Sequence, residues 1–363
     1  MEKTYLPTAL RWRPKNFFEV AGQEHVIKVL CSDIANNRIK RAYLFLGAYG
    51  VGKTTVARIL AKRLNCLEPR GVEPCNKCNP CLGISSDTYE DYHEIDGGSA
   101  TGVDNIRWLR SRAVEQPLSP TGALVFVIDE AHMLTNNAFN ALLKILEEPP
   151  CNTYFILVTT APHKIPATVR SRCQAHHFRK ISFTNILKYL KSIITAENIN
   201  MEDGSLSLIA RESDGSLRDA ENFLDKVCSY SGTKEISIAD VISVLGTADR
   251  TLVIDLASTV VRKDSTACLH ILRVADERGV DIYRLYHELI FCFRDLMVMR
   301  ICGPDKLLIK VSGDEMRRLF SLASCTNVYD LQKAFSLLAE SEPVENRASR
   351  PYLEYALIRA ATR

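Results

Sequence analysis

The sequence has no long hydrophobic run, little net charge and no low-complexity tract. Without about 18 consecutive apolar residues, it predicts no membrane-spanning helix. No apolar segment follows the first four residues, so we expect no secretory signal and a cytoplasmic location. Twelve cysteines in 363 residues are too few for a disulfide scaffold. The remaining composition, 46% hydrophobic and 25% charged, is typical of a globular protein with two or three domains.

Short apolar runs alternate with helical patterns in the first half of the chain. We predict buried strands at 43–46, 124–128 and 154–158, and helices at 23–38, 52–65, 103–115 and 135–148. Strands that are apolar throughout and alternate with helices are typical of a parallel sheet covered on both faces. Residues 66–82, rich in Pro and Cys, are interpreted as an irregular insert in this α/β domain.

Strand signals fade after residue 182, and helical patterns replace them. They occur at 184–197, 204–212, 216–230 and 237–244, and further helical stretches follow Gly246. We therefore predict an α/β domain at 1–180, a small helical domain at 181–244 and a second helical domain at 245–363.

Residues 47–54 read Gly-Ala-Tyr-Gly-Val-Gly-Lys-Thr and fit the P-loop pattern G-x-x-x-x-G-K-[ST]. The glycines let backbone N–H groups surround a phosphate chain at a helix N-terminus. Lys53 is expected to reach the β- and γ-phosphates of ATP, and Thr54 to place its hydroxyl on Mg²⁺. The alternative is a chance glycine-rich turn, which the predicted strand before it and helix after it disfavour. The predicted nucleotide-binding residues here are Gly47, Gly50, Val51, Gly52, Lys53, Thr54 and Thr55.

Two acids, Asp129 and Glu130, end the predicted strand at 124–128. Ligands of parallel sheets meet the carboxyl ends of the strands. We expect Asp129 to hold the magnesium together with Thr54, and Glu130 to act as general base on the attacking water. The alternative is an acidic turn ahead of the next helix.

Four cysteines cluster in the insert, as Cys66-x8-Cys75-x2-Cys78-x2-Cys81. This spacing suits a tetrahedral zinc site with Zn–S bonds of about 2.3 Å, and a closed set of four thiolates indicates a structural metal. An iron–sulfur cluster stays open as a weaker alternative.

Two arginines, Arg172 and Arg218, stand in polar segments further along. Arg172 lies in Ser-Arg-Cys, and Arg218 opens a predicted helix after Gly215. A guanidinium, in cis or from a neighbouring subunit, can stabilise a phosphoryl group in transfer. Surface arginines without such a role are the alternative.

These motifs, taken in order, resemble the gamma/tau subunits of the bacterial DNA polymerase III clamp loader, a family of AAA+ ATPases. The matching stretches are Arg11–Pro14, Gly22–Val26, the P-loop, Asn65-Cys66, the cysteine run, Glu94–Asp96, Asp129–Leu134, Phe139–Pro150, Thr159-Thr160, Ser171–Cys173 and Gly215–Ala220. They cover residues 11 to about 220, whereas the region beyond 245 agrees only in length and helical character. One departure is Tyr49, where family members often carry a basic residue.

The resemblance implies roles for residues that the motifs alone leave open. Thr160, or its neighbour Thr159, would be sensor 1, which contacts the γ-phosphate. Arg218 would be sensor 2, acting in cis, and Arg172 would be the arginine finger donated in trans. The stretch from Arg11 to Val20 would line the adenine side of the site.

The resemblance also implies a function. ATP binding would open a sliding clamp and load it on primer-template DNA, and hydrolysis would release it. The cofactors would be ATP, Mg²⁺ and Zn²⁺. The partners would be the delta and delta prime subunits and further gamma/tau copies. Residues 245–363 would form the collar that joins them, and no membrane would be a partner. The length suggests a gamma-like chain without a tau-type extension. Two alternatives are another AAA+ DNA-remodelling ATPase and a non-hydrolysing, delta-prime-like stator.

Overall fold

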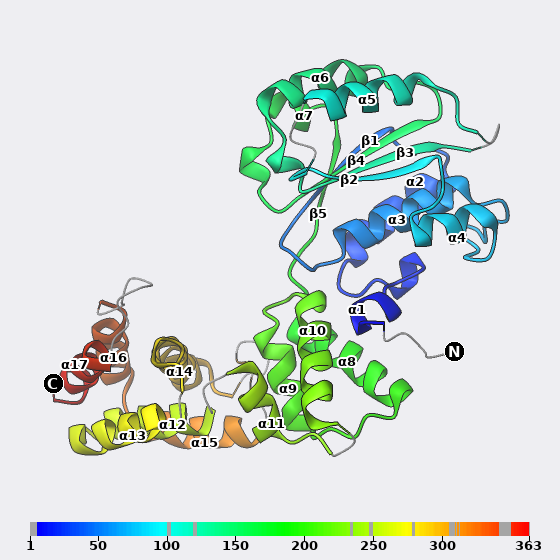
Figure 1. Ribbon diagram of the computed structural model, residues 1–363. Coiled ribbons are helices and arrows are strands. Elements are labelled where there is room, and N and C mark those ends of the chain that lie inside the picture. The colour runs from blue at the N-terminus through cyan, green and yellow to red at the C-terminus, as the bar shows by residue number, and fades with distance from the viewer. Residues whose placement is uncertain are drawn as a thin grey trace. The chain divides into compact units, whose positions relative to one another are not determined.

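The computed structural model divides into two compact units. It describes residues 6–99, 103–118, 122–232, 235–246, 250–277, 280–304, 309, 311, 313–340 and 350–362. The first unit is Met1–Ile193 with Glu212–Asn222, and the second is Ile194–Arg211 with Phe223–Arg363. Figure 1 labels the elements of both.

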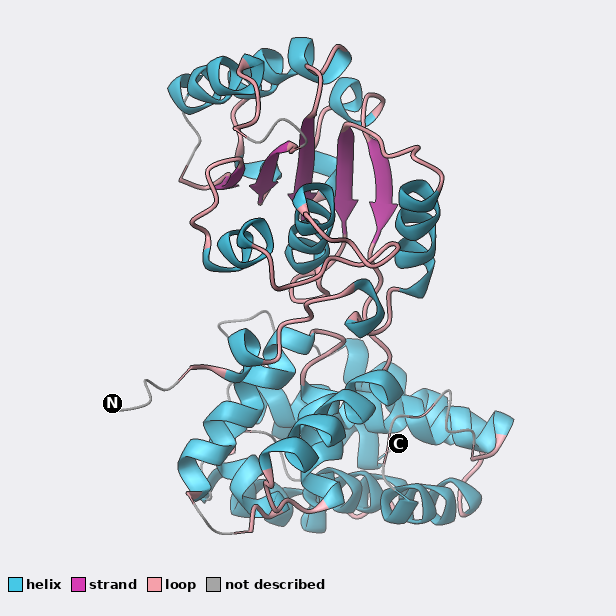
Figure 2. Ribbon diagram, turned by 90° about the vertical axis from the view of Figure 1, so that its right-hand side faces the viewer, coloured by secondary structure: helices cyan, strands magenta, loops and turns pink. Residues whose placement is uncertain are grey.

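A five-stranded parallel sheet forms the centre of the first unit (Figure 2), in the order β2-β3-β4-β1-β5. Its strands are β1 (Ala42–Leu46), β2 (Tyr92–Asp96), β3 (Leu124–Asp129), β4 (Thr153–Thr159) and β5 (Gln174–His177). Each strand pairs in parallel with its neighbours. The parallel sheet confirms the predicted α/β class, and β1, β3 and β4 confirm the three predicted strands.

Helices cover both faces of this sheet (Figure 1). One face carries α2 (Glu24–Ala35), α3 (Lys53–Asn65) and α4 (Asn79–Ser86), which bury Tyr43, Phe45 and Val125. The other carries α5 (Val103–Val114), α6 (Asn136–Glu147) and α7 (Ala167–Arg170), which bury Leu44 and Phe126. Because successive strand residues point to opposite faces, strands covered on both sides must be apolar at every position.

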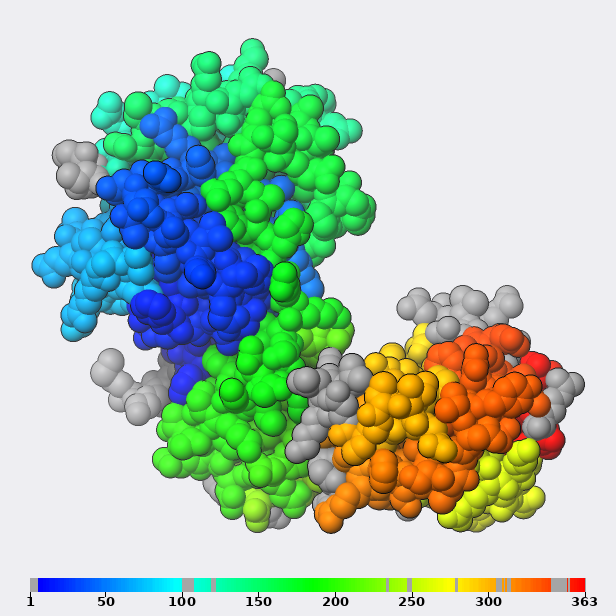
Figure 3. All heavy atoms as spheres, turned by 180° about the vertical axis from the view of Figure 1, so that it is seen from behind, coloured from blue at the N-terminus to red at the C-terminus, as the bar shows by residue number. Residues whose placement is uncertain are grey.

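The N-terminal segment contributes two short helices to the first unit, α1 (Thr8–Arg11) and η1 (Phe17–Glu19). The dark-blue N-terminal segment and the light-blue cysteine-bearing insert lie side by side (Figure 3). Two further short elements are η2 (Ala131–Met133) and η3 (Pro162–Lys164). The longer helix α8 (Phe183–Glu197) belongs to the first unit up to Ile193.

The described residues of the second unit form helices and no strand, apart from an isolated β-bridge between Met201 and Ile236. Its helices are α9 (Asp203–Glu212), α10 (Leu217–Ser231), α11 (Ile238–Leu245), α12 (Arg250–Val261), α13 (Ser265–Glu277), α14 (Ile282–Cys302), α15 (Gly313–Ser324), α16 (Val328–Glu340) and α17 (Arg350–Thr362). The first six residues of α10 belong to the first unit, as does Glu212. The core gathers around α14, whose Leu285, Leu289, Phe293 and Leu296 are buried against α12, α15, α16 and α17. No described helix is long and apolar enough to cross a membrane.

A group of buried charges accompanies this apolar core. Arg250, 9% exposed, donates to Glu288 Oε2 at 3.0 Å and to Asp295 Oδ2 at 2.9 Å. Buried charges persist in a fold only when such partners compensate them.

Two expectations about the first unit were incomplete or wrong. The edge strands β2 and β5 were not predicted, because their mixture of His, Glu, Gln and apolar residues lacks the continuous apolar run of a central strand. The insert is not irregular throughout, since Asn79–Ser86 forms α4 with Pro80 in its first turn. Proline is well tolerated there because that N–H needs no acceptor within the helix.

Candidate functional site

A cavity of about 350 Å³ lies in the first unit at the carboxyl ends of β1 and β3. Its walls include Gly50 to Thr55, the acids Asp129 and Glu130, and Arg218 of α10. The N-terminal segment completes it with Pro7, Ala9, Leu10, Arg13, Pro14, Val20 and Ala21. The volume suits a small organic ligand, and the position is where parallel sheets bind one.

The loop between β1 and α3 is shaped for an anion. Gly50 has φ +68°, and a Cβ there would come within 2.0 Å of Ser216 Oγ, so only glycine fits. Gly52 precedes α3 with φ +97°, and Lys53, Thr54 and Thr55 form the first turn. N–H groups in a first turn have no acceptor within the helix and are available to phosphate oxygens.

Lys53 is 6% exposed and folds back along this loop. Its Nζ donates to the carbonyl oxygens of Gly47 at 2.9 Å and Ala48 at 2.6 Å. Burial lowers the pKa of Lys53, while Glu130 and Asp129 act in the opposite direction. The predicted residue Gly47 does not line the cavity. Its carbonyl oxygen accepts a hydrogen bond from Lys53, which does line it.

Thr54 and Asp129 converge from different elements. Thr54 Oγ1 donates to Asp129 Oδ2 at 2.8 Å, which brings the start of α3 to the end of β3. A hydroxyl and a carboxylate are the oxygen ligands that Mg²⁺ takes in nucleotide sites. The donor set therefore fits the magnesium site that the sequence predicts.

Glu130 is held at the cavity edge by two side chains. Thr160 Oγ1 donates to Glu130 Oε2 at 3.0 Å, and His132 Nδ1 lies 3.2 Å from the same oxygen. Thr159 is fully buried and bonds instead to His132 Nδ1 at 3.1 Å. Of the two threonines that the sequence leaves open, Thr160 is the one in contact with the predicted base.

Arg218 lines the cavity from the start of α10. Its guanidinium carbon lies 5.2 Å from the centroid of the Tyr49 ring. The Leu217 N–H also donates to the Gly50 carbonyl oxygen at 3.0 Å. The tip of the P-loop and the first turn of α10 are therefore in direct contact.

Arg172 is not brought to the cavity of its own chain. Its Nε donates to Glu147 Oε1 at 2.8 Å, a second nitrogen bonds the same oxygen, and Nη1 donates to the Thr168 carbonyl oxygen at 2.6 Å. It lines a surface hollow with Lys40 and Arg41. An arginine placed there can act on a nucleotide only if the nucleotide belongs to another chain.

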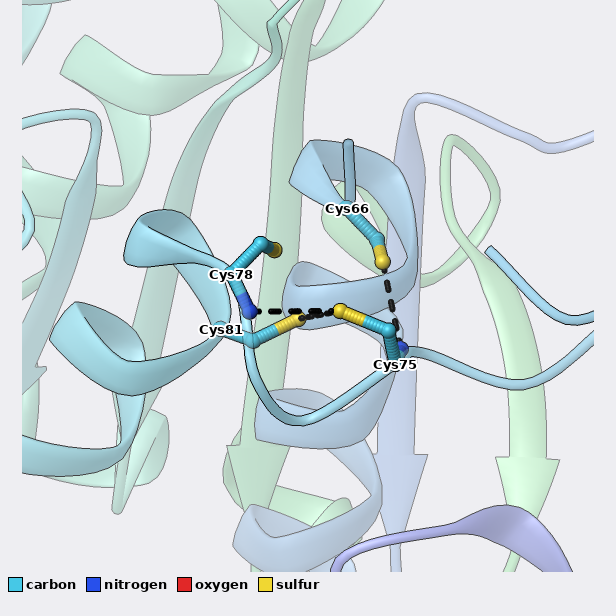
Figure 4. Close-up of side chains that lie close together, drawn as sticks. All are labelled: Cys66, Cys75, Cys78 and Cys81. Carbon is cyan, nitrogen blue, oxygen red and sulfur yellow. Dashed lines mark hydrogen bonds between the residues drawn. The ribbon is translucent and has the colours of Figure 1, made fainter. Parts of the chain in front are cut away.

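The four predicted metal ligands do come together (Figure 4). Their Sγ atoms all lie within 4.8 Å of one another. A tetrahedral ion with Zn–S bonds of about 2.3 Å would separate the sulfurs by roughly 3.8 Å. This arrangement fits one ion better than an iron–sulfur cluster, whose several irons would hold the thiolates further apart.

Backbone N–H groups point at the sulfurs, as thiolate ligands require. Cys75 N–H donates to Cys66 Sγ at 3.2 Å, while the N–H groups of Lys77 and Cys78 donate to Cys75 Sγ at 3.4 and 3.3 Å. The last two bonds lower the pKa of Cys75 to about 6, whereas burial raises those of Cys66 and Cys81. The donor set therefore fits a thiolate-bound metal.

The cavity residues that sequence reasoning missed include Tyr189 of α8 and Glu221 of α10. The Tyr189 hydroxyl lies 2.5 Å from Glu221 Oε1 and 3.1 Å from the Trp12 carbonyl oxygen. Neither residue stands in a motif, and only helix packing brings them together.

Three family models match consecutive parts of the chain. They are the DNA polymerase III delta subunit at residues 22–182, the DNA polymerase III clamp loader subunit ATPase lid domain at 185–233, and domain III of the DNA polymerase III subunits gamma and tau at 236–363.

Relatives of known name agree with these models. The DNA polymerase III subunit tau of Bacillus subtilis is 40% identical over 85% of this chain and 55% of its own length. The DNA polymerase III subunit gamma of Buchnera aphidicola subsp. Acyrthosiphon pisum is 36% identical over 79% of each chain. A solved structure of Thermotoga maritima RuvB T158V overlaps loosely, at 18% identity and TM-score 0.48, over 86% of this chain and 90% of that one. The chain spans about half the length of the first tau subunits that it matches, from 49% to 55%.

Proposed function

The chain belongs to the gamma and tau subunits of DNA polymerase III, and we propose that it is the ATP-hydrolysing motor of a clamp loader. One observation carries the proposal: the phosphate loop, the Thr54–Asp129 pair, Glu130 and Arg218 line a single cavity. Phosphoryl transfer needs a phosphate cradle, a metal site, an oriented nucleophile and added positive charge, and each has a residue here.

Binding rests on the P-loop. The first-turn N–H groups of α3 bind phosphate oxygens, and Lys53 exchanges its two carbonyl contacts for the β- and γ-phosphates. Thr54 and Asp129 would hold Mg²⁺, which neutralises charge on the phosphates when bound. Leu10, Arg13 and Val20 form the wall that we assign to the adenine side.

Hydrolysis rests on Glu130 and its partners. Glu130 orients the attacking water and accepts its proton, and Thr160 holds the carboxylate in place until then. We assign Thr160 as sensor 1 and Arg218 as sensor 2, acting in cis. Arg172 acts in trans on the nucleotide of a neighbouring subunit, after leaving Glu147.

The remaining assignments follow from family membership. We propose the domains 1–180, 181–244 and 245–363, the last as a collar that joins delta, delta prime and further gamma/tau copies. The lid model at 185–233 lies within the second of these domains, and the domain III model at 236–363 includes all of the third. The four cysteines would hold a structural Zn²⁺ in a module at 66–82. The sliding clamp and primer-template DNA would be the substrates of the assembled loader, in the cytoplasm.

ATP hydrolysis tests the proposal, measured on the purified chain and then with the other loader subunits, clamp and primed DNA. We expect slow turnover alone and a sharp rise in the full mixture. The absence of turnover in both would favour the stator alternative. Stimulation by DNA without any effect of the clamp would favour another DNA-remodelling ATPase.

Two variants separate binding from catalysis. Lys53→Ala should abolish ATP binding. Arg172→Ala should leave binding intact and remove hydrolysis in the assembled loader, while Arg170→Ala, an exposed neighbour on α7, should do neither. Full hydrolysis by an assembly of Arg172→Ala subunits would refute the trans assignment.

A further inference from the structure

The cysteine-bearing insert is hydrogen-bonded to the N-terminal segment through Glu73. Phe17 N–H donates to Glu73 Oε2 at 2.9 Å, and Phe18 N–H donates to Glu73 Oε1 at 3.2 Å. Both donors belong to the first turn of η1, whose N–H groups have no acceptor within the helix. One carboxylate, more than fifty residues away in sequence, therefore caps this turn.

Asn76 makes a second set of contacts with the same segment. Its Nδ2 donates to Asn16 Oδ1 at 2.6 Å and to the Lys15 carbonyl oxygen at 3.2 Å. Lys62 Nζ, from α3, donates to Asn76 Oδ1 at 3.4 Å. The Asn76 amide thus connects the N-terminal segment, the insert and α3.

The conformation of Asn76 depends on the cysteines around it. Asn76 lies between Cys75 and Cys78 with φ +57°, in the left-handed region that Asn tolerates. The Lys77 and Cys78 N–H groups bond to Cys75 Sγ and close this tight turn. A metal on the sulfurs would fix the same turn and, with it, the direction of the Asn76 side chain.

Residues 15–18, which Glu73 and Asn76 bind, lie between two stretches of the cavity wall. Arg13 and Pro14 precede them, and Val20 and Ala21 follow them. Figure 3 shows the insert beside this N-terminal segment. A shift of residues 15–18 would therefore move the wall on both sides.

We propose that Glu73 and Asn76 are positioning residues, through which the cysteine-bearing insert sets the N-terminal wall of the nucleotide cavity. Metal on the cysteines and nucleotide in the cavity then favour the same placement of residues 13–21, so each strengthens the binding of the other. The inference rests on the proposed function, because it assigns the cavity to ATP.

Titration of the full chain with a fluorescent ATP analogue tests the inference. Glu73→Gln keeps the size of the side chain but leaves one N–H without its acceptor. Asn76→Gly keeps the left-handed turn and removes both contacts of the amide with the N-terminal segment. If either change lets the wall leave its binding position most of the time, ATP binding weakens by about threefold to tenfold. Zinc content should stay at the wild-type value, and Glu68→Gln, an exposed acid of the same insert, should bind ATP as wild type does.

A second readout is independent of the nucleotide. Amide hydrogen exchange at Phe17 and Phe18 should be faster in Glu73→Gln than in Glu68→Gln, and faster after the wild-type chain is stripped of zinc by a chelator. Returning zinc alone should restore the slow exchange.

Two results would overturn the inference. In one, both Glu73→Gln and Asn76→Gly bind ATP as tightly as Glu68→Gln does. This would mean that the buried Phe17 side chain alone fixes the segment. The other is exchange at Phe17 and Phe18 that does not respond to zinc. If the wild-type chain bound no more ATP than Lys53→Ala does, the proposed function would fail. If the inference alone failed, the wild-type chain would still bind ATP, so the two failures are distinguishable.

Discussion

Tyr49 lies beside Arg218 in the wall of the proposed nucleotide cavity, so we expect its removal to weaken ATP binding. The guanidinium carbon lies 5.2 Å from the ring centroid, and Tyr49 is 50% exposed. A cation over a tyrosine face at such an exposed site contributes about 0.5–1 kcal/mol. Tyr49→Ala should therefore raise the dissociation constant for ATP by about twofold to fivefold.

Two further substitutions at this position show which property of the side chain matters. Tyr49→Phe keeps the ring and should bind ATP as the wild type does. Tyr49→Leu keeps an apolar side chain without a π face, so it should weaken ATP binding by the same factor of about two to five as Tyr49→Ala.

Equilibrium titrations with ATP and ADP provide the assay, with Arg218→Ala as the reference. If Arg218 contacts the γ-phosphate, the Tyr49 variants should lose more affinity for ATP than for ADP. Equal ATP affinity in Tyr49→Ala and Tyr49→Phe would refute the reasoning. So would tighter ATP binding by Tyr49→Ala, because it would mean that the ring withholds Arg218 from the nucleotide.

Three other predictions concern different parts of the chain. Thr160→Val removes the hydroxyl bonded to Glu130, so we expect turnover at least about tenfold slower with an unchanged ATP dissociation constant, measured by steady-state kinetics and titration. Burial lowers the pKa of His176, so below its ordinary value of 6.5 the unfolded chain binds more protons than the folded one. The free energy of unfolding should then fall as the pH drops from 7.5 to about 5.5 in urea titrations, and less steeply in His176→Phe. Arg250→Met removes one of the two arginine partners of the buried Asp295 and a partner of the half-buried Glu288, so it should cost about 3 kcal/mol in urea unfolding, the lower end for a broken buried pair. The control Arg318→Met, which breaks an exposed pair, should cost less than about 1 kcal/mol; equal costs would contradict the assignment.

The parts of the site that the sequence predicts are those whose chemistry is local. The glycines of the P-loop and the lysine after them are adjacent in sequence, and so are Asp129 and Glu130 at the end of an apolar strand. A carboxylate that follows a buried strand must lie at the ligand-binding edge of a parallel sheet. The contact between Thr54 and Asp129 follows from that topology without further information.

The parts that the sequence does not predict depend on contacts between distant segments. Glu73 has no motif around it, and only the folded chain shows that it caps the turn at Phe17. Tyr189 reads as one more position of an amphipathic helix until its hydroxyl is seen beside Glu221. The edge strand β2 was missed for a related reason, since Glu94 is polar within the strand and is compensated by Arg58 of α3 at 2.6 Å.

The ion pair between Arg172 and Glu147 has a consequence for how subunits would associate and separate. Both side chains are substantially exposed, and such ion pairs contribute only about 0.2–1 kcal/mol. If Arg172 acts on the phosphate of an adjoining chain as proposed, it gives up only this weak pair, so little free energy opposes its transfer. Glu147 would then be the anion to which the arginine returns once the terminal phosphate departs.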